Sequence, residues 1–558
     1  MATDLIPPEA PLEAPRPTGA EGAALAPLRR PVFRMLWTAW MIANICMWTN
    51  DVAAAWVMTT LKVSPLMVAL IQTASTAPVF LLGVPSGALA DILDRRMYFL
   101  VTQIWIAFIA TLLCIASLAD ALTPATLLLL TFLNGIGLAM RWPVFAAVVP
   151  ELVPRNELPA ALALNGVAMN ISRIVGPVIA GAMLASIGSH AVFIFNGVMS
   201  LVCATIILRW KREQTPSSLP GERFFGAMRV GLQYVRESPR MRAVMLRVAL
   251  FFLQSTALLA LLPLVAIRLN AHGDSATQWL GTIGGGAATF TLMLASLGAG
   301  AIYAALQMPK LRGRFDRSEI VTRGSWVQAV ASLIVAYAPN LWVALPAMVV
   351  AGMSWIAVAN SLSVSAQLGL PNWVRARGMS MFQMSIMGAS AIGAAVWGQL
   401  ATVTDLATSL TAAAVTGSIA VWLTRNLVIE SDVEQDLTPL RPWDPPETVL
   451  PVDSDAGPVV TTIEYRVDAE NAVKFHEVMA DTRRARLKGG ALSWELFRDT
   501  ADPDRYIEYI VDETWVEHLR RFDRTNAEDV ALRERRHALQ MDGKAPVVSR
   551  CISETFKR

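Results

Sequence analysis

The stretch from Ser64 to Arg96, SPLMVALIQTASTAPVFLLGVPSGALADILDRR, decides the fold class of this chain. Its uncharged part, Pro65 to Ala90, is long enough to cross a bilayer core of roughly 30 Å as an α-helix. A charged turn follows from Asp91 to Arg96, and a second apolar segment, Met97 to Leu118, starts directly after it. The pattern predicts two membrane-spanning helices joined by a short charged loop at the membrane surface.

The composition of the whole chain also favours a membrane protein. Of the 558 residues, 54% are hydrophobic and only 16% are charged, and the mean hydropathy is +0.45. A water-soluble protein would have difficulty burying so much apolar surface, whereas a bilayer accepts it. The net charge of +3 is too small to indicate a nucleic-acid partner, and the four cysteines show no pairing or metal-ligand spacing. We therefore expect no nucleic acid, no metal and no cofactor.

Twelve apolar segments are long enough to be membrane-spanning helices. They fall into two groups of six, separated by a polar stretch that contains an amphipathic segment at Phe224–Val235. The expected helices are about Leu36–Met58, Pro65–Ala90, Met97–Leu118, Pro124–Val149, Leu158–Ile187, Ala191–Leu208, Ala243–Leu269, Thr277–Gln307, Ile320–Tyr337, Trp342–Gln367, Ala376–Val403 and Leu406–Thr424.

These segments divide the chain into six parts. The fold class that we predict is an all-α membrane protein of two pseudo-symmetric six-helix bundles, followed by a small α+β domain. The parts are a Pro- and Ala-rich tail (1–30), a first bundle (31–209), a middle loop (210–241), a second bundle (242–425), a Pro-rich linker (426–458) and the α+β domain (459–558).

The loops on one side of the predicted membrane carry most of the arginines and lysines. Arg95 and Arg96 join the second helix to the third, and the middle loop is rich in arginine, whereas the alternate loops offer little beyond Lys62 and Arg268. The first 30 residues lack the apolar core of a signal peptide. Positive charge marks the cytoplasmic side, so we expect a multi-pass protein of the cytoplasmic (inner) membrane with both termini in the cytoplasm.

The charged turn resembles a known motif. Gly87-x-Leu89-Ala90-Asp91-x-x-x-Arg95-Arg96 resembles the loop between helices 2 and 3 of the major facilitator superfamily, except that Asp94 replaces its second glycine. The resemblance implies a transporter that works by alternating access. It also implies a latch in which Glu151 reaches Arg95, and Asp91 approaches the start of the eleventh helix near residues 375–378. If the turn is helical, Asp91 and Arg95 share one face. Alternatively, Gly87 only packs helices and the charges only mark the interface.

Three charged residues lie deep inside predicted spans, away from their ends: Asp51, Arg141 and Arg173. Charges inside a membrane are costly and are candidates for function. Asp51 and Arg173 lie at similar depths, so Asp51 is expected to pair with Arg173 or with Arg141. The pair has either a structural role or a role in proton coupling and substrate binding. Asn50 and Gln254 occupy corresponding places in the first and seventh helices, where they either line a cavity or bond helix to helix.

A glycine–proline pattern in the fifth helix points to export. Gly176-Pro177-x-x-x-Gly181, preceded by Arg173, resembles a motif of superfamily exporters, in which the glycines allow close helix approach and the proline bends the helix. A packing kink without a role in the mechanism is the alternative. The segment Pro150–Arg155, with Ser64-Pro65, Ala260–Leu264 and Gly298–Gly300, resembles the branch that contains enterobactin exporter-like and other drug- or siderophore-efflux proteins.

The last hundred residues alternate between strand-like and helical patterns in the order β-α-β-β-α-β, which is ferredoxin-like. One helix is expected over Trp515–Gln540. With Trp515 and His518 at the start of that helix, the domain resembles dimeric α+β barrel domains related to antibiotic-biosynthesis monooxygenases. The resemblance implies a homodimer. Trp494, Trp515 and His518 either line a pocket in this domain or belong to its core.

The sequence therefore predicts a secondary transporter rather than an enzyme. We expect proton-driven efflux of small amphipathic molecules across the lipid bilayer. The alternative is a membrane-anchored ligand sensor or enzyme in which the α+β domain carries the activity. The glycines at 284–286 lack a P-loop lysine, which gives no support for ATP-driven transport, and no Ser/His/Asp cluster stands out.

Overall fold

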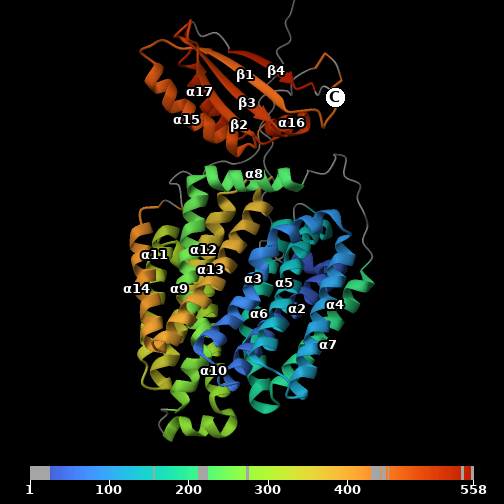
Figure 1. Ribbon diagram of the computed structural model, residues 1–558, viewed down its shortest axis with the longest axis vertical. Coiled ribbons are helices and arrows are strands. Elements are labelled where there is room, and N and C mark those ends of the chain that lie inside the picture. The colour runs from blue at the N-terminus through green and yellow to red at the C-terminus, as the bar shows by residue number, and fades with distance from the viewer. Residues whose placement is uncertain are drawn as a thin grey trace, which may run out of the picture.

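The computed structural model describes residues 25–154, 157–210, 224–271, 275–371, 373–427, 429, 440, 448–449, 451–541 and 546–554. Most of the N-terminal tail, the middle loop before Phe224 and most of the Pro-rich linker lie outside these residues. A body of long helices forms the lower part of the molecule, and a smaller domain with a sheet lies above it (Figure 1).

Among the described residues, twelve long helices form the lower body, as predicted. They are α2 (Pro31–Thr60), α3 (Pro65–Ile92), α4 (Arg95–Leu118), α5 (Pro124–Leu152), α6 (Leu158–Ser186), α7 (Ser189–Arg209), α9 (Pro239–Ala271), α10 (Ser275–Arg312), α11 (Arg317–Tyr337), α12 (Leu341–Leu368), α13 (Arg375–Val403) and α14 (Leu406–Thr424). A short 3₁₀ helix (Ala26–Arg29) precedes them, and α8 (Phe224–Glu237) lies across one end of the body.

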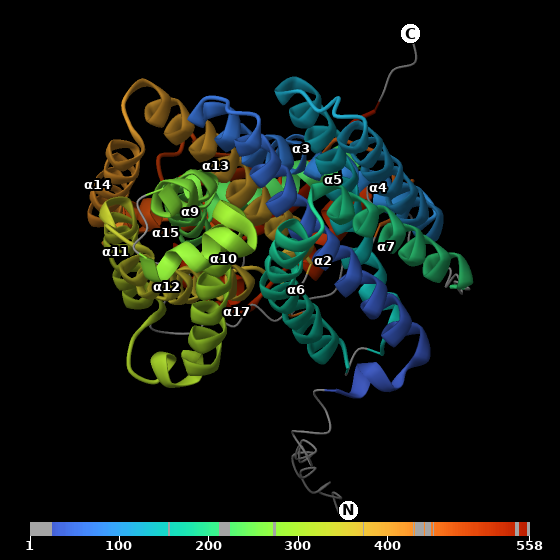
Figure 2. The ribbon, with the colours of Figure 1, turned by 90° about the horizontal axis from the view of Figure 1, so that it is seen from below.

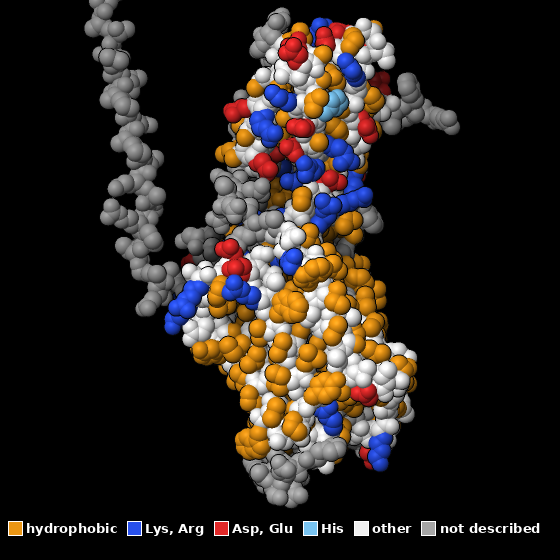
Figure 3. Space-filling model, turned by 90° about the vertical axis from the view of Figure 1, so that its left-hand side faces the viewer, with side chains coloured by type: hydrophobic (Ala, Val, Ile, Leu, Met, Phe, Trp, Pro, Cys, Tyr) orange, Lys and Arg blue, Asp and Glu red, His pale blue; other side chains and the backbone are white. Residues whose placement is uncertain are grey.

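Eleven of the described helices are long and apolar enough to cross a membrane. The remaining long helix is α2, whose middle holds the polar residues Asn44, Asn50 and Asp51. Large apolar side chains such as Leu81, Phe108 and Leu306 are exposed on the body. On the face seen in Figure 3, the middle of the body is mostly apolar, whereas charged side chains gather on the upper domain and at the ends of the body. Such a surface is stable only against lipid, which confirms a multi-pass membrane protein.

The twelve helices form two halves, α2–α7 and α9–α14, which meet mainly through α3 with α13 and α6 with α10 (Figure 2). We call the end nearest α8 the α8 end. At the opposite end, the halves are closely packed. If Gly398 carried a Cβ atom, that atom would lie only 2.5 Å from the Ala69 side chain, so there is no space for a larger residue. The Thr402 hydroxyl also accepts a hydrogen bond from the Leu66 backbone amide at 2.9 Å. Nearer the α8 end, a Cβ on Gly166 would meet no atom within 4 Å.

The charged turn is not one continuous helix, which corrects an expectation. Leu93 and Asp94 are extended between α3 and α4, so Asp91 and Arg95 belong to different helices and do not share a helical face. Asp94 has a structural role here, because its carboxylate accepts a hydrogen bond from the Met97 amide at 2.9 Å and caps the start of α4. The residue that departs from the superfamily motif thus serves as the N-cap of α4.

The upper domain has the predicted element order. Its strands are β1 (Val459–Arg466), β2 (Ser493–Arg498), β3 (Arg505–Asp512) and β4 (Val547–Ile552), in an antiparallel sheet of order β2-β3-β1-β4. The helices are α15 (Ala472–Lys488), α16 (Trp515–Asp523) and α17 (Ala527–His537). The single helix expected over Trp515–Gln540 is therefore wrong: the chain leaves helical geometry at Asn526, whose side chain caps α17.

The upper domain rests on α8. Arg229 of α8 forms a 3.0 Å ion pair with Glu513, and the Gln233 amide donates to the Ala491 carbonyl at 2.8 Å. The guanidinium of Arg524 lies 4.7 Å from the ring centroid of Trp373, which precedes α13. The domain thus contacts both the amphipathic helix and the connection between α12 and α13.

Candidate functional site

The two halves meet in the middle of the helices around one cation. The guanidinium carbon of Arg173, halfway along α6, lies 4.1 Å from the ring centroid of Trp355 on α12 and 5.4 Å from that of Trp48 on α2. Trp355 belongs to the second half, so this cation bridges the halves. Such contacts contribute about 0.5–2 kcal/mol, and more as water is excluded. The Arg173 side chain is partly exposed, and its Nε has no hydrogen-bond partner among the described residues.

Asp51 lies one helical turn beyond Trp48 on α2. Its carboxylate accepts a hydrogen bond from the Ser75 hydroxyl of α3 at 2.9 Å. Among the described residues it forms no ion pair with Arg141 or Arg173, so the pairing expected from helix depth is not present in this structure. The reason is geometric: Arg173 is directed toward the indoles, and Arg141 is turned to a different stretch of α2.

Arg141 has a different environment from Arg173. It is only 1% exposed and donates to the Ala43 carbonyl at 3.0 Å and to the Asn44 side-chain oxygen at 3.2 Å. Its guanidinium also lies 5.2 Å from the ring centroid of Trp40. These contacts are all with α2 in the same half. The geometry therefore ties α5 to α2, which favours the structural alternative for Arg141.

Asn50 and Gln254 face matching neighbours in the two halves. The Asn196 amide of α7 donates to the Asn50 oxygen at 3.2 Å. Gln254 packs against Gly417 of α14. A Cβ atom on Gly417 would lie only 2.1 Å from the side-chain amide carbon of Gln254. Both are buried and both face the sixth helix of their half. Asn50 thus bonds helix to helix, the second of the two roles considered for these residues.

The glycine–proline segment of α6 packs on both halves. A Cβ on Gly176 would lie 2.5 Å from the Trp48 side chain of α2, and one on Gly181 would lie 1.8 Å from the Thr291 hydroxyl of α10. Only glycine allows both approaches. Pro177 lies inside the same helix. This segment brings Arg173, one turn earlier, against the opposite half.

The residues of the superfamily-like turn lie at the α8 end. Arg95 forms a 2.5 Å ion pair with Glu151 of α5, and Arg96 donates to the Leu208 carbonyl at the end of α7 at 2.6 Å. A Cβ on Gly87 would meet no atom within 4 Å, so this glycine is not required by close packing. The Asp91 side chain lies outside the described part of the structure, and its expected contact with α13 stays a prediction.

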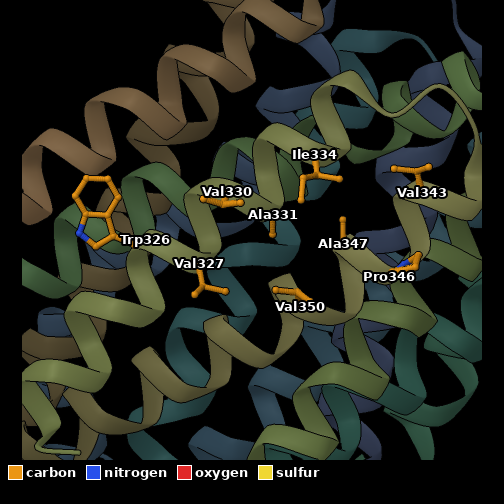
Figure 4. A pocket seen from close by; sticks show the side chains of 9 residues that line it. All are labelled: Trp326, Val327, Val330, Ala331, Ile334, Val343, Pro346, Ala347 and Val350. Carbon is orange, nitrogen blue, oxygen red and sulfur yellow. The ribbon is translucent and has the colours of Figure 1, made fainter.

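An apolar groove lies elsewhere, on the surface of α11 and α12. It has a volume of about 380 Å³ and is lined by residues such as Trp326, Val330 and Pro346 (Figure 4). Several of its side chains, including Trp326 and Val330, are exposed on the outside of the bundle. With no ionisable group in its lining, this groove suits lipid chains rather than a substrate site.

The sequence did not reveal Trp48 and Trp355. Each is a tryptophan in an apolar segment, where aromatic residues are common, and only the folded arrangement places both against Arg173. Among the described residues, no cluster of three or more His, Cys, Asp or Glu side chains could hold a metal ion.

These features define a class of protein: a membrane transporter with the major facilitator fold. The solved structures that share that fold at low identity include two transporters. The nucleoside transporter NupG matches with a TM-score of 0.56 and 13% identity, over 71% of this chain and 99% of its own. A bacterial homologue of the human lysosomal transporter Spinster, in an inward-facing and occupied conformation, matches with a TM-score of 0.57 and 16% identity, over 73% and 99%.

The family follows from a family model described as transmembrane secretion effector, which matches residues 22–558. The chain belongs to this family of major facilitator transporters. The Staphyloferrin A transporter of Staphylococcus aureus is 23% identical over 29% of this chain and 41% of its own length. Macrolide efflux protein A of Streptococcus pyogenes is 24% identical over 42% of this chain and 58% of its own. The chain thus spans about half the length of these curated relatives.

The buried contact of Arg141 generates a stability prediction. Asn44→Leu leaves the guanidinium buried with one partner fewer, so we expect a loss of about 1–3 kcal/mol of stability. Adding Arg141→Met should recover part of this loss, because the unpaired charge is then gone. Thermal unfolding of the purified protein measures both effects. Asn360→Leu is the control, since Asn360 accepts a weak 3.4 Å bond from Arg312 at an exposed site. Unchanged stability in Asn44→Leu would contradict the assignment.

Proposed function

We propose that this transporter exports small amphipathic molecules from the cytoplasm in exchange for protons. The observation that carries the proposal is the mid-depth contact of Arg173 with Trp48 and Trp355, which joins the two halves. In alternating access, a substrate site lies where the halves meet, near the middle of the membrane. The names of the relatives, a siderophore transporter and a macrolide efflux protein, support efflux of this class of molecule.

The proposed orientation places the α8 end in the cytoplasm. The arginines of the turn and of α8 support it through the positive-inside rule. The close packing at the opposite end and the open space beside Gly166 are then features of an inward-facing state. A substrate from the cytoplasm would reach Arg173 from the α8 end and bind its apolar surface against the two indoles.

Asp51 is the proposed proton carrier. It is a carboxylate in the middle of a predicted span, and its one described hydrogen bond comes from the neutral Ser75 hydroxyl. No arginine is paired with it here, so its charged form lacks a counter-ion. A carboxyl group in such a place takes up a proton readily. Uptake from one side and release to the other would couple proton influx to efflux.

Asp51→Asn should therefore leave the protein folded but abolish uphill, gradient-dependent transport. A resistance and accumulation screen in an efflux-deficient host supplies the substrate, and proteoliposomes with an imposed pH gradient measure its accumulation. We expect downhill exchange to persist and concentration against the gradient to be lost. Asp120→Asn, at an exposed turn at the far end of the helices, is the matched control and should behave as wild type. An Asp51→Asn variant that still concentrates substrate would contradict the coupling role.

The turn between α3 and α4 is proposed to act as a latch. The Arg95–Glu151 ion pair supports this role, because it fixes the start of α4 to the end of α5 at the α8 end. Asp91 would then meet the N-terminus of α13, where unpaired backbone N–H groups favour an anion, when the α8 end closes. The latch would hold the outward-facing state and release in the inward-facing one.

The upper domain is proposed to pair with a second copy. The face of its sheet opposite the helices carries the side chains of Phe497 and Tyr509, whose rings meet edge to face at 6.1 Å, and Phe497 is 52% exposed. An exposed aromatic pair on an open sheet face supports the dimer that the α+β barrel resemblance implies.

Light scattering of the purified full-length chain should thus report a dimer. Phe497→Glu should convert it to a monomer, because it places a charge in the apolar contact. Val473→Glu, on the exposed surface of α15, is the control and should remain dimeric. A monomeric wild-type chain, or a dimer that survives Phe497→Glu, would contradict the proposal.

A second candidate function is a membrane-anchored sensor or enzyme based on the upper domain. The cavity between its sheet and helices favours this candidate. A truncated chain that ends at residue 430 distinguishes the two candidate functions. If this chain still exports substrate, the transporter function is supported. If it does not, and the upper domain binds a ligand, the sensor or enzyme function is supported.

A further inference from the structure

The upper domain contains a cavity of about 320 Å³ that has no part in the transport mechanism described above. It lies between the inner face of the sheet and the helices α15, α16 and α17. One wall is apolar and includes Ile463, Ile510, Phe522, Leu532 and Val548. The volume lies at the lower end of the range for small-molecule sites, which usually combine an apolar wall with a few polar groups.

A buried histidine lines this cavity with one nitrogen unused. His518 is fully buried, and its Nδ1 lies 2.7 Å from the Asp512 carboxylate. Burial alone would raise the pKa of Asp512, but Arg521, at 3.1 Å, and His518 lower it, so Asp512 is charged and accepts a hydrogen bond. Burial in turn lowers the pKa of His518, which is therefore neutral. Its Nδ1 carries the hydrogen, and its Nε2 is an acceptor without a partner among the described residues.

The lining also has an excess of positive charge. It contains one carboxylate, Asp529, and six arginines: Arg486, Arg521, Arg524, Arg533, Arg536 and Arg550. Three of these arginines form ion pairs with carboxylates beside the cavity: Arg486 with Glu508, Arg521 with Asp512 and Arg524 with Glu517. Six arginines thus face four carboxylates, which leaves an excess of two positive charges.

Two of these arginines, Arg536 and Arg550, are the candidates for binding an anion. Arg536 is only 5% exposed and donates to the neutral Thr482 hydroxyl at 2.9 Å, while its Nε has no partner among the described residues. Arg550 lies on β4 at the exposed rim of the cavity. Neither forms an ion pair with a described residue. Glu508 and Asp529 act on Arg536 only from beyond ion-pair distance, so an anion bound directly to this buried cation would stabilise its charge further.

We propose that this cavity binds a small organic acid with an apolar, ring-sized body. The acid group binds Arg536 and Arg550, the body packs on the apolar wall, and a hydroxyl group of the ligand donates to His518 Nε2. The site also adjoins the contact between the domain and the membrane helices, because Arg524 lines the cavity and reaches Trp373.

The test is calorimetric titration of the full-length, detergent-solubilised chain with 4-hydroxybenzoate and with its neutral analogue 4-hydroxybenzamide. We expect saturable binding of the acid at roughly millimolar concentration or below, and at least about tenfold weaker binding of the amide, since a charge-assisted hydrogen bond is lost. Arg550→Gln should weaken acid binding about tenfold. Arg550 is exposed, so this variant is expected to fold, which thermal unfolding checks.

Arg535→Gln is the matched control. Arg535 is next to Arg536 on α17, but it is exposed and lies 3.7 Å from Asp481, outside the cavity. Its loss should leave binding unchanged. The proposal is overturned if 4-hydroxybenzoate does not bind saturably, if the amide binds equally well, or if Arg535→Gln weakens binding as much as Arg550→Gln. None of these binding measurements depends on transport, so their outcome does not decide whether the proposed efflux function is correct.

Discussion

The contact of one guanidinium with two indole rings, at the middle of the helices, is the interaction on which this arrangement depends. Arg173 is a cation in a helix that is otherwise apolar, and it has no carboxylate partner among the described residues. Its charge is stabilised by the faces of Trp48 and Trp355, which come from opposite halves. Aromatic faces hold a cation less tightly than an ion pair in a dry interior does. The contact can therefore separate without leaving a buried carboxylate unpaired.

The other two intramembrane charges, Arg141 and Asp51, have different kinds of bonding partner from Arg173. Arg141 bonds to fixed acceptors on α2 within its own half, which makes it part of a rigid frame. Asp51 accepts from the neutral Ser75. All three charges lie in the first half, whereas the second half contributes the Trp355 ring and a neutral bond at 2.7 Å from Ser354 to Gln328. At the contact between the halves, the first half therefore supplies the cation and the second half supplies an aromatic face.

The sequence predicted the fold well, because spanning helices and alternating strands have strong periodic signals. The twelve helices, the two halves and the succession of strands and helices along the upper domain follow from apolar segment length and from alternating patterns. Side-chain pairing was harder. Depth along a helix suggested that Asp51 meets Arg173, but depth does not fix the direction in which a side chain points. The kink at Asn526 was missed because one capping residue within a charged helical pattern gives a weak signal.

The central claim is that the halves open and close at the α8 end as Asp51 gains and loses a proton. Double electron–electron resonance between spin labels at Leu93 and Gln367 tests it most directly. Both positions are exposed near that end, Leu93 directly after α3 and Gln367 on α12, and Cys114 and Cys551 are replaced by serine. The account predicts two distance populations, with the longer one favoured at mildly acidic pH and the shorter one at mildly alkaline pH. Asp51→Asn should remove this dependence on pH. A single population, or a pH response that survives Asp51→Asn, would contradict the account.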